Sequence, residues 1–236
     1  MSETLKKDRI VALLPMKANS SRVKGKNFRD FLGKPLFMHI LDSLLSIDEI
    51  SQVVINTDAR DILAQYNCVD SERVLIRDRR LEICGDDVSM NLVLADDVQN
   101  IYADTYLMTH TTNPLLNADT IKKALQSFNA SRKNNGADSL FTVNKVQTRF
   151  YRSDGSAVNH NPNNLIPTQN IEPWFEENSN LYIFTAESFA KSNARIGNSP
   201  IMFETPPLES IDIDTPSDWD FALLAGQLLS SNSASA

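Results

Sequence analysis

Short apolar runs recur along the chain, each rich in β-branched or aromatic residues and bounded by polar positions. Runs of this length and composition are typical of β-strands. We therefore expect strands at 9–15, 52–58, 73–78, 104–110, 138–143, 180–185 and 200–204.

Several segments between these runs have the spacing of an amphipathic helix. Pro35 stands where such a helix begins, and apolar residues then repeat at helical intervals. These residues are Phe37, Ile40, Leu41, Leu44 and Leu45. Weaker periodicity at 89–101 and 117–128 indicates two more helices. Alternating strands and helices favour an α/β fold with a mostly parallel, Rossmann-like sheet, helices on both faces, and ligands beyond the carboxyl ends of the strands.

The alternation stops between 145 and 178, in a stretch rich in Asn, Pro and Ser that has no helical repeat. A long irregular segment in a compact domain is usually functional or forms an interface. A chain of 236 residues that is 42% hydrophobic can bury one sizeable core. We therefore expect a single domain over 1–236 with an irregular insertion at 145–178.

Composition narrows the set of partners. The formal net charge is -7 and the sequence pI is about 5.0, which argues against a broad surface for nucleic acid or anionic membranes. No apolar run approaches the roughly 18 residues that a membrane span needs, and the first residues lack the apolar core of a signal peptide. These features predict a cytoplasmic protein that binds neither nucleic acid nor a membrane.

Cations are concentrated in one loop that follows the first expected strand. Residues 11–29 contain no acid and five cationic side chains: Lys17, Arg22, Lys24, Lys26 and Arg29. The glycine-rich phosphate-binding motifs are absent, so side chains must supply most of the charge. Together with backbone N–H groups near Ser20 and Ser21, they could neutralise a polyphosphate. The alternative is a basic loop exposed to solvent.

Two carboxylates, Asp212 and Asp214, share one face of an expected extended segment because side chains alternate along a strand. Adjacent carboxylates repel unless a cation lies between them, and oxygen ligands near a polyphosphate suit Mg²⁺. The alternative is an exposed strand with solvated acids. We assign Asp218 to the cap of the helix that follows. A cationic loop and a metal-binding pair together describe nucleotidyl transfer, in which both neutralise charge on the α-phosphate and on departing pyrophosphate.

Four blocks lie in order between residues 11 and 220: LLPMKANSSRVKGKNFRDFLGKPL, VVINTD, HTTNPLL, and the pair NSNLYIF and SIDIDTPSDW. As a set they resemble the acylneuraminate cytidylyltransferase family, the synthetases of CMP-sialic acid and related CMP-sugars. The resemblance implies a nucleotidyltransferase fold, CTP as donor and Mg²⁺ as cofactor. It also implies a homodimer in which the insertion at 145–178 packs on the partner subunit and contributes to the acceptor site.

The resemblance also implies roles for individual residues. The catalytic cations would be Lys17, Arg22 and Lys26, and the metal ligands Asp212 and Asp214. The nucleotide-binding residues would be Leu14, Ser20, Asn27, Arg77 and Ser89. The acceptor-binding residues would be His110, Thr112, Gln169, Glu176 and Asn180. Simpler alternatives are a turn cap for Asn27, a helix N-cap for Ser89 and an ion pair with Asp78 for Arg77.

The sequence departs from the family pattern at positions that concern the acceptor. Lys17 stands where the family has its first arginine, and His110 and Leu116 replace a glutamine and an arginine. Thr168, Glu176 and Glu177 stand where sialic-acid enzymes place arginines that bind the sugar carboxylate. Unless Arg149, Arg152 or a partner residue substitutes, these changes favour an acceptor that carries an amine or a phosphonate, or one whose anion is held elsewhere, over N-acetylneuraminate.

The leading hypothesis is a cytidylyltransferase that transfers CMP from CTP to a sialic-acid-like nonulosonate sugar or a related compound and releases pyrophosphate. Its acceptor could instead be a phosphonate or an amino-bearing compound. Two alternatives come from other classes: a nucleotide-binding protein on the same fold that has lost its activity, and a metal-dependent sugar transferase that also uses a D-x-D motif. Release of pyrophosphate separates the first hypothesis from both.

Overall fold

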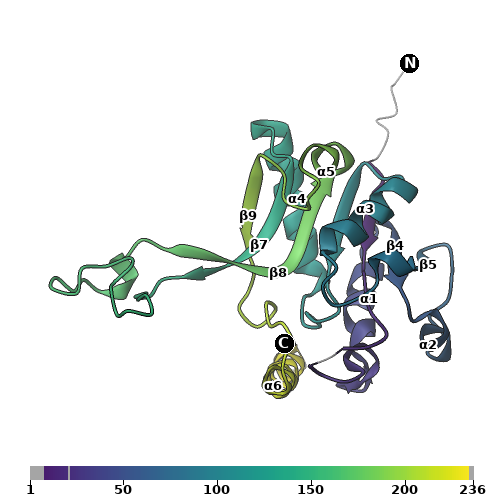
Figure 1. The fold of residues 1–236 in the computed structure, drawn as a ribbon, viewed down its shortest axis with the longest axis horizontal. Helices are drawn as coiled ribbons and strands as arrows, with labels where there is room; N and C mark the ends of the chain where they lie inside the picture. Colours follow the sequence, from purple (N-terminus) through teal and green to yellow (C-terminus); the bar gives the residue numbers. More distant parts are fainter. Residues whose placement is uncertain (1–7, 21, 234–236) are drawn as a thin grey trace.

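The structure is a computed structural model that describes residues 8–20 and 22–233 (Figure 1). Its strands are β1 (Ile10–Leu13), β2 (Asp30–Phe31), β3 (Lys34–Pro35), β4 (Ile50–Thr57), β5 (Val74–Asp78), β6 (Thr105–Thr109), β7 (Ser139–Val146), β8 (Trp174–Thr185) and β9 (Pro200–Glu204). The α-helices are α1 (Leu36–Leu45), α2 (Arg60–Gln65), α3 (Met90–Asn100), α4 (Ala118–Asn135), α5 (Ala186–Ser192) and α6 (Pro216–Ser233). Short 3₁₀ helices are η1 (Lys26–Phe28), η2 (Leu81–Ile83) and η3 (Thr168–Asn170).

Seven strands form one sheet in the order β5-β4-β1-β6-β8-β7-β9. Strands β5, β4, β1 and β6 run parallel to one another, and β7 runs parallel to β9. Strand β8 is antiparallel to both of its neighbours, β6 and β7. The expected mostly parallel sheet is therefore confirmed, and every expected strand overlaps a strand of this sheet.

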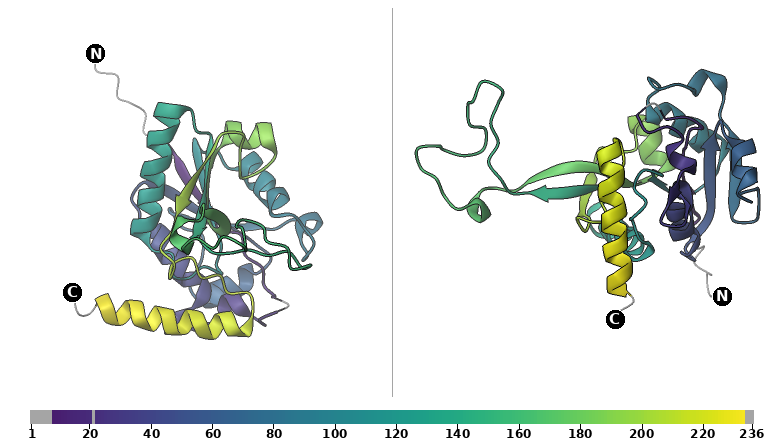
Figure 2. Two further views of the ribbon diagram at one scale, coloured as in Figure 1. Left: turned by 90° about the vertical axis from the view of Figure 1, so that its left-hand side faces the viewer. Right: turned by 90° about the horizontal axis from the view of Figure 1, so that it is seen from below.

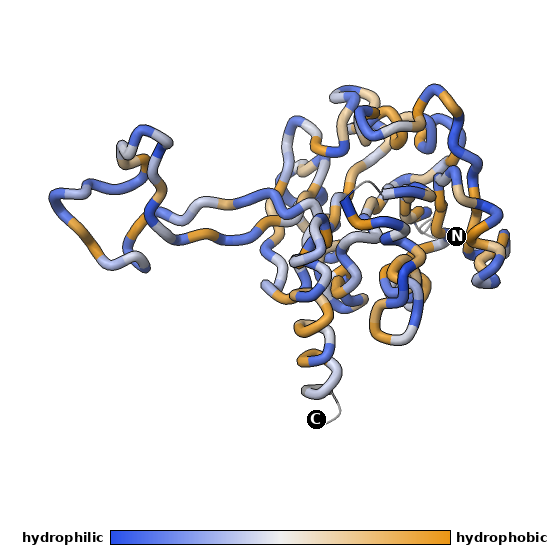
Figure 3. Tube along the Cα trace, turned by 60° about the horizontal axis from the view of Figure 1, so that its bottom comes forward, coloured by the Kyte–Doolittle hydropathy of each residue, from blue (hydrophilic) through white to orange (hydrophobic). Residues whose placement is uncertain are grey.

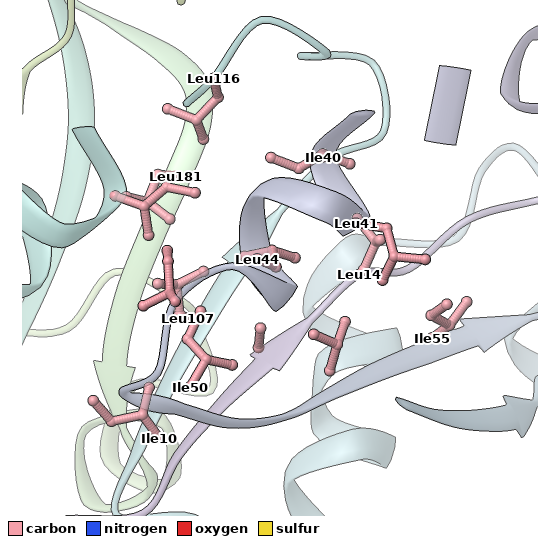
Figure 4. Packing of buried hydrophobic residues seen from close by; sticks show 14 of the residues in the cluster. Ile10, Leu14, Ile40, Leu41, Leu44, Ile50, Ile55, Leu107, Leu116 and Leu181 are labelled. Atoms are coloured by element: carbon pink, nitrogen blue, oxygen red, sulfur yellow. The ribbon is translucent and has the colours of Figure 1, made fainter. Parts of the chain in front are cut away.

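Helices cover both faces of the sheet. Successive side chains of β1 point to opposite faces, so they pack alternately against the helices of one face and of the other. Ile10, Ala12 and Leu14 join one buried cluster with residues of α1, α2 and α4, part of which is drawn in Figure 4. Val11 and Leu13 join a second cluster with residues of α3 and α5. A central parallel strand buried on both faces needs this continuous apolar sequence.

The C-terminal helix α6 lies outside the two faces of the sheet and packs on the β2–β3 hairpin. Trp219 meets Phe31 edge-on, with ring centroids 5.6 Å apart. The helix begins with the expected cap, since Asp218 Oδ2 accepts a hydrogen bond from Thr215 N at 2.7 Å and Thr215 Oγ1 accepts one from Asp218 N at 3.3 Å. This cap fixes the direction of the chain just after the two aspartates.

The ends of β7 and β8 leave the sheet together as a two-stranded arm, which projects from the body in Figures 1 and 2. Pairing continues from Val143 opposite Glu177 to Val146 opposite Trp174. The register shifts between Phe141 and Val143, a β-bulge that marks where the arm departs. The expected irregular segment 145–178 is therefore strand at both ends, and its irregular part is the loop 147–173 with η3.

Within the described part of the chain, none of the helices combines the length and the apolar character needed to cross a lipid bilayer.

Candidate active site

A polar cavity opens at the carboxyl ends of β1, β5 and β6, as expected for a parallel sheet. The loop after β1 contributes most of its wall, and the segments after β5 and β6 close two other sides. The side chains that carry charge or hydrogen-bonding groups here are Lys17, Asn19, Ser20, Arg22, Lys26, Asn27, Arg79, Asp86, His110, Thr111, Thr112 and Asp214.

The three cations expected to be catalytic, Lys17, Arg22 and Lys26, all line this cavity. Gly25, in the left-handed conformation with φ of 61°, turns the chain so that Lys26 begins a 3₁₀ helix and becomes buried. Lys17 pairs with Asp86 at 2.8 Å at the cavity rim. The loop therefore places Lys26 deep in the cavity and Lys17 at its rim.

The two other cations of the loop do not line the cavity. Lys24 is exposed, and Arg29 lies over the Trp219 ring at 4.3 Å. Ser20 lines the cavity, whereas Ser21 lies outside the described residues. Three of the five cations thus face the position where an anion would bind.

Lys26 joins the cationic loop to the paired carboxylates. Its Nζ donates a hydrogen bond to the Ile213 carbonyl oxygen and lies 3.4 Å from Asp214 Oδ1. Arg22 NH2 approaches the same Asp214 oxygen at 3.1 Å. Two segments from opposite ends of the chain therefore meet in one site, with positive and negative groups in contact.

Asp212, like Asp214, is partly buried, but unlike Asp214 it does not line the cavity. Burial raises its pKa, a hydrogen bond with Thr112 opposes this, and the charge of Asp214 adds to it. Its Oδ1 is buried and has no hydrogen-bond partner among the described residues. The backbone is fixed here, since Ile213 N donates to Thr112 O at 2.9 Å. An orphaned carboxylate oxygen beside a second carboxylate fits a cation.

Asn27 connects the loops that follow β1 and β6. Its Nδ2 donates to Lys17 O at 2.8 Å, and its Oδ1 accepts from Thr111 Oγ1 at 2.7 Å. The side chain is buried and lines the cavity. It acts as a bridge between loops, a role beyond the simple turn cap.

His110 also lines the cavity, where it is uncharged at neutral pH. Burial lowers its pKa to about 4, and the positive charges of Arg195 and Lys26 act in the same direction, against Asp214. A neutral imidazole can donate one hydrogen bond and accept another. Thr112 stands beside it and holds Asp212, so of the five expected acceptor residues these two lie at the cavity.

Besides Arg22, the cavity is lined by Arg79, which the sequence interpretation did not select, and not by the expected Arg77. Arg77 belongs to β5 and forms ion pairs with Asp96, at 2.9 Å, and with Asp97. Arg79 follows the end of β5, is buried, and donates from Nε to Asn56 Oδ1 at 2.9 Å. Burial lowers its pKa. The signal in the sequence is its position one residue beyond the strand, where the chain turns into the cavity.

Four other expected site residues lie away from this cavity. Leu14 is a fully buried member of the core. Ser89 is the N-cap of α3, where its side chain accepts from Asn91 N at 3.3 Å. Gln169 and Glu176 lie on the arm, where Glu176 accepts from Asn144 Nδ2 at 3.2 Å.

Asn180 supports the segment that carries the aspartates. It is buried, and its Nδ2 donates to the Glu209 carbonyl oxygen at 2.9 Å. The buried Glu209 carboxylate accepts from Asn117 N at 3.0 Å, from Asn117 Nδ2 at 2.7 Å and from Thr120 Oγ1 at 3.0 Å. Glu209 thereby ties the start of α4 to the segment that leads to Asp212. Nothing in the sequence around Glu209 indicated this role.

Comparison with known families identifies the class of this protein. The family model described as cytidylyltransferase matches residues 11–228. The chain belongs to the cytidylyltransferase family. It is therefore a CTP-dependent nucleotidyltransferase, and the resemblance drawn from its sequence blocks is confirmed.

Named relatives match over nearly their whole length. The CMP-N,N'-diacetyllegionaminic acid synthase of Legionella pneumophila is 27% identical over 89% of this chain and 93% of its own. The pseudaminic acid cytidylyltransferase of Campylobacter jejuni serotype O:2 is 24% identical over 90% of this chain and 94% of its own.

Solved structures share the fold at lower identity. A CMP:2-keto-3-deoxy-manno-octonic acid synthetase complexed with CTP has a TM-score of 0.64 at 14% identity, over 94% of this chain and 99% of its own. The 4-diphosphocytidyl-2C-methyl-D-erythritol synthase of Anaerococcus prevotii has a TM-score of 0.63 at 14% identity, over 94% of this chain and 100% of its own. The nucleotidyltransferase fold expected from the sequence is confirmed.

Proposed function

We propose that this cytidylyltransferase transfers CMP from CTP to a nonulosonate sugar and releases pyrophosphate. The observation that carries the proposal is the meeting of Lys26 and Arg22 with Asp214 at the carboxyl ends of the parallel strands. The class of acceptor is supported by the legionaminic and pseudaminic acids in the names of the two relatives.

In this reaction an acceptor hydroxyl oxygen attacks the α-phosphorus of CTP. The new bond joins that oxygen to phosphorus, the bond to the β-phosphate oxygen breaks, and the hydroxyl proton goes to a base or to solvent. Negative charge builds up on the phosphate oxygens, and Lys17, Arg22 and Lys26 stabilise it by charge-assisted hydrogen bonds. Ser20, Asn27 and Arg79 would hold the nucleotide in the same cavity.

Asp212 and Asp214 would hold Mg²⁺. The described residues contain no group of three or more histidine, cysteine or acidic side chains suited to a metal. A pair of carboxylates completed by substrate phosphates is nonetheless the coordination that Mg²⁺ commonly takes, and the partnerless Oδ1 of Asp212 fits it. When bound, Mg²⁺ supplies positive charge that neutralises the triphosphate.

We also propose a homodimer formed through the arm. Trp174 and Phe175 are 41% and 44% exposed, and Leu165 in the arm loop is 62% exposed. Figure 3 shows hydrophobic and hydrophilic stretches alternating along the arm. Exposed apolar side chains on an arm that leaves the body of the protein are stabilised when a second copy covers them. Sedimentation velocity would show a species of twice the chain mass, and a monomer at micromolar concentration would exclude this assembly.

The test of the function is CTP-dependent release of pyrophosphate, measured with Mg²⁺ and each of several acceptors. N,N'-diacetyllegionaminate and N-acetylneuraminate test the nonulosonate class, while a phosphonate and an amino-bearing sugar test the alternative acceptors. We expect release with an acidic nonulosonate and none with CTP alone. A protein that binds CTP but releases no pyrophosphate with any of these acceptors would be the nucleotide-binding protein without activity.

A further inference from the structure

A second cavity adjoins the polar cavity of the candidate active site, in which the nucleotide is proposed to bind, and Met90 lines both. This second cavity has a volume of about 310 Å³ and lies between the start of α3, the base of the arm at Glu177 and the segment after α5. An acceptor must lie beside the α-phosphate to react with it. A cavity that shares a wall with the nucleotide cavity meets this requirement.

Arg195 is the cation of this second cavity. Its side chain is 20% exposed, and its guanidinium carbon lies 3.9 Å from the centroid of the Tyr182 ring. The backbone of Arg195 is anchored as well, because its N–H donates to Asn91 Oδ1 at 3.4 Å. Stacking on an aromatic ring orients a planar guanidinium without using its N–H donors.

Most of these donors remain available for a ligand. Within the described residues, the guanidinium has one ion pair, a long contact of 3.5 Å from NH2 to Glu177 Oε1. Arginine has five N–H donors in a fork that matches a carboxylate. Arg195 is therefore oriented, partly buried and only loosely paired.

Glu177 has a second partner of its own. It accepts a hydrogen bond from the Tyr182 hydroxyl. Burial raises the pKa of Tyr182 to about 12, which keeps this hydroxyl protonated at neutral pH, with Arg195 opposing and Glu177 reinforcing the effect. A ligand carboxylate that takes the place of Glu177 at Arg195 consequently does not leave Glu177 unpaired.

We propose that Arg195 binds the carboxylate of the acceptor and so selects acidic sugars over neutral ones. The inference rests on the proposed function and adds the group that recognises the acid. It explains how an acidic acceptor can bind although Thr168, Glu176 and Glu177 stand where relatives offer cations. The anion is held outside the arm loop, by the segment after α5.

The experiment compares N,N'-diacetyllegionaminate with its C1 carboxamide, which has the same shape but no charge. Steady-state pyrophosphate release would be measured for the wild type, Arg195→Gln and Arg195→Lys. Arg132→Gln is the matched control, because Arg132 lies on α4 with its ion pair to Asp8. The melting temperature of each variant with and without CTP would report folding and nucleotide binding.

For the wild type and Arg132→Gln, we expect KM for the carboxamide at least tenfold above KM for the acid. For Arg195→Gln, KM for the acid should rise until acid and carboxamide agree within about threefold, while KM for CTP changes less than twofold. For Arg195→Lys, the ratio of the two KM values should lie between those of the wild type and Arg195→Gln. An ammonium group keeps the positive charge but lacks the forked N–H donors of a guanidinium.

An acid-to-carboxamide ratio in Arg195→Gln equal to that of the wild type would overturn the inference and leave the proposed function intact. No pyrophosphate release by the wild type with either compound would overturn both. Should Arg195→Gln fail to fold, the wild type and Arg195→Lys decide: equal KM values for acid and carboxamide in the wild type would also refute the assignment.

Discussion

Glu209 is a buried carboxylate whose removal should destabilise the fold. It is 6% exposed and accepts three hydrogen bonds from Asn117 and Thr120. Glu209→Gln keeps the shape but leaves one acceptor oxygen, so at least one donor then faces an amide N–H. A buried donor without a partner costs about 1–3 kcal/mol, and a hydrogen bond to a charged group is worth about 1.5–3 kcal/mol. We expect a loss of about 2–4 kcal/mol.

Urea unfolding followed by circular dichroism measures this loss, which corresponds to a decrease of roughly 5–15 °C in melting temperature for a chain of this size. The matched control is Glu187→Gln on α5, whose exposed carboxylate pairs with Lys191 at 2.6 Å. An exposed pair of this kind is worth about 1 kcal/mol or less. If Glu209→Gln loses no more stability than Glu187→Gln, the assignment of Glu209 as the link between α4 and the aspartate segment is wrong.

Three further predictions concern two residues of the site and a glycine in the loop after α5. Asp214→Asn should abolish pyrophosphate release, as should EDTA, with the melting temperature within about 3 °C of wild type; unchanged turnover in either case would remove the metal from the proposal. Because the pKa of His110 is lowered to about 4 in the folded protein, His110 stays neutral there while it protonates below about 6.5 when unfolded. Stability should therefore fall by about 2 kcal/mol between pH 7 and pH 5, and urea unfolding of His110→Gln should show that much less pH dependence. Gly197→Ala should cost about 1–3 kcal/mol in urea unfolding, since its Cβ would meet Ser188 Oγ at 2.2 Å and Asp138 Oδ1 at 2.4 Å; a cost below 0.5 kcal/mol would show that this loop yields easily.

Hydropathy was sufficient to predict the sheet and the helices α1, α3 and α4, because their burial is repeated over many positions, whereas α6 was expected from its cap. Helix α4 continues to Asn135, beyond the expected 128, since its last turns are polar and carry no apolar periodicity. Helices α2 and α5 have six and seven residues, too few for a periodic signal. The strands of the arm could not be predicted for another reason. Residues 174–177 are all exposed, so the sequence there shows no alternation of buried and exposed positions.

At the site, sequence reasoning identified residue types better than positions. The stretch from 77 to 80 offers arginines at 77, 79 and 80, and only the end of β5 at Asp78 determines which of them turns into the cavity. The extended segment expected around Asp212 and Asp214 belongs to no strand of the sheet, and Ile213 is fully buried between them. Arg195 was not considered because it belongs to no motif, and its position becomes meaningful only once β8 places Tyr182 beneath it.

The contact between Lys26 and Asp214 joins residues 188 positions apart in the chain. During synthesis at about 5–20 residues per second, Asp214 is therefore added to the chain roughly 10–40 s after Lys26. Strand β8, which lies between β6 and β7, is also made after both of them. The candidate active site is thus among the most non-local features of the fold, and its formation requires loop entropy to be lost late in folding. Binding of nucleotide should accordingly report completed folding, since chains that have only the first half of the sheet lack half of the site.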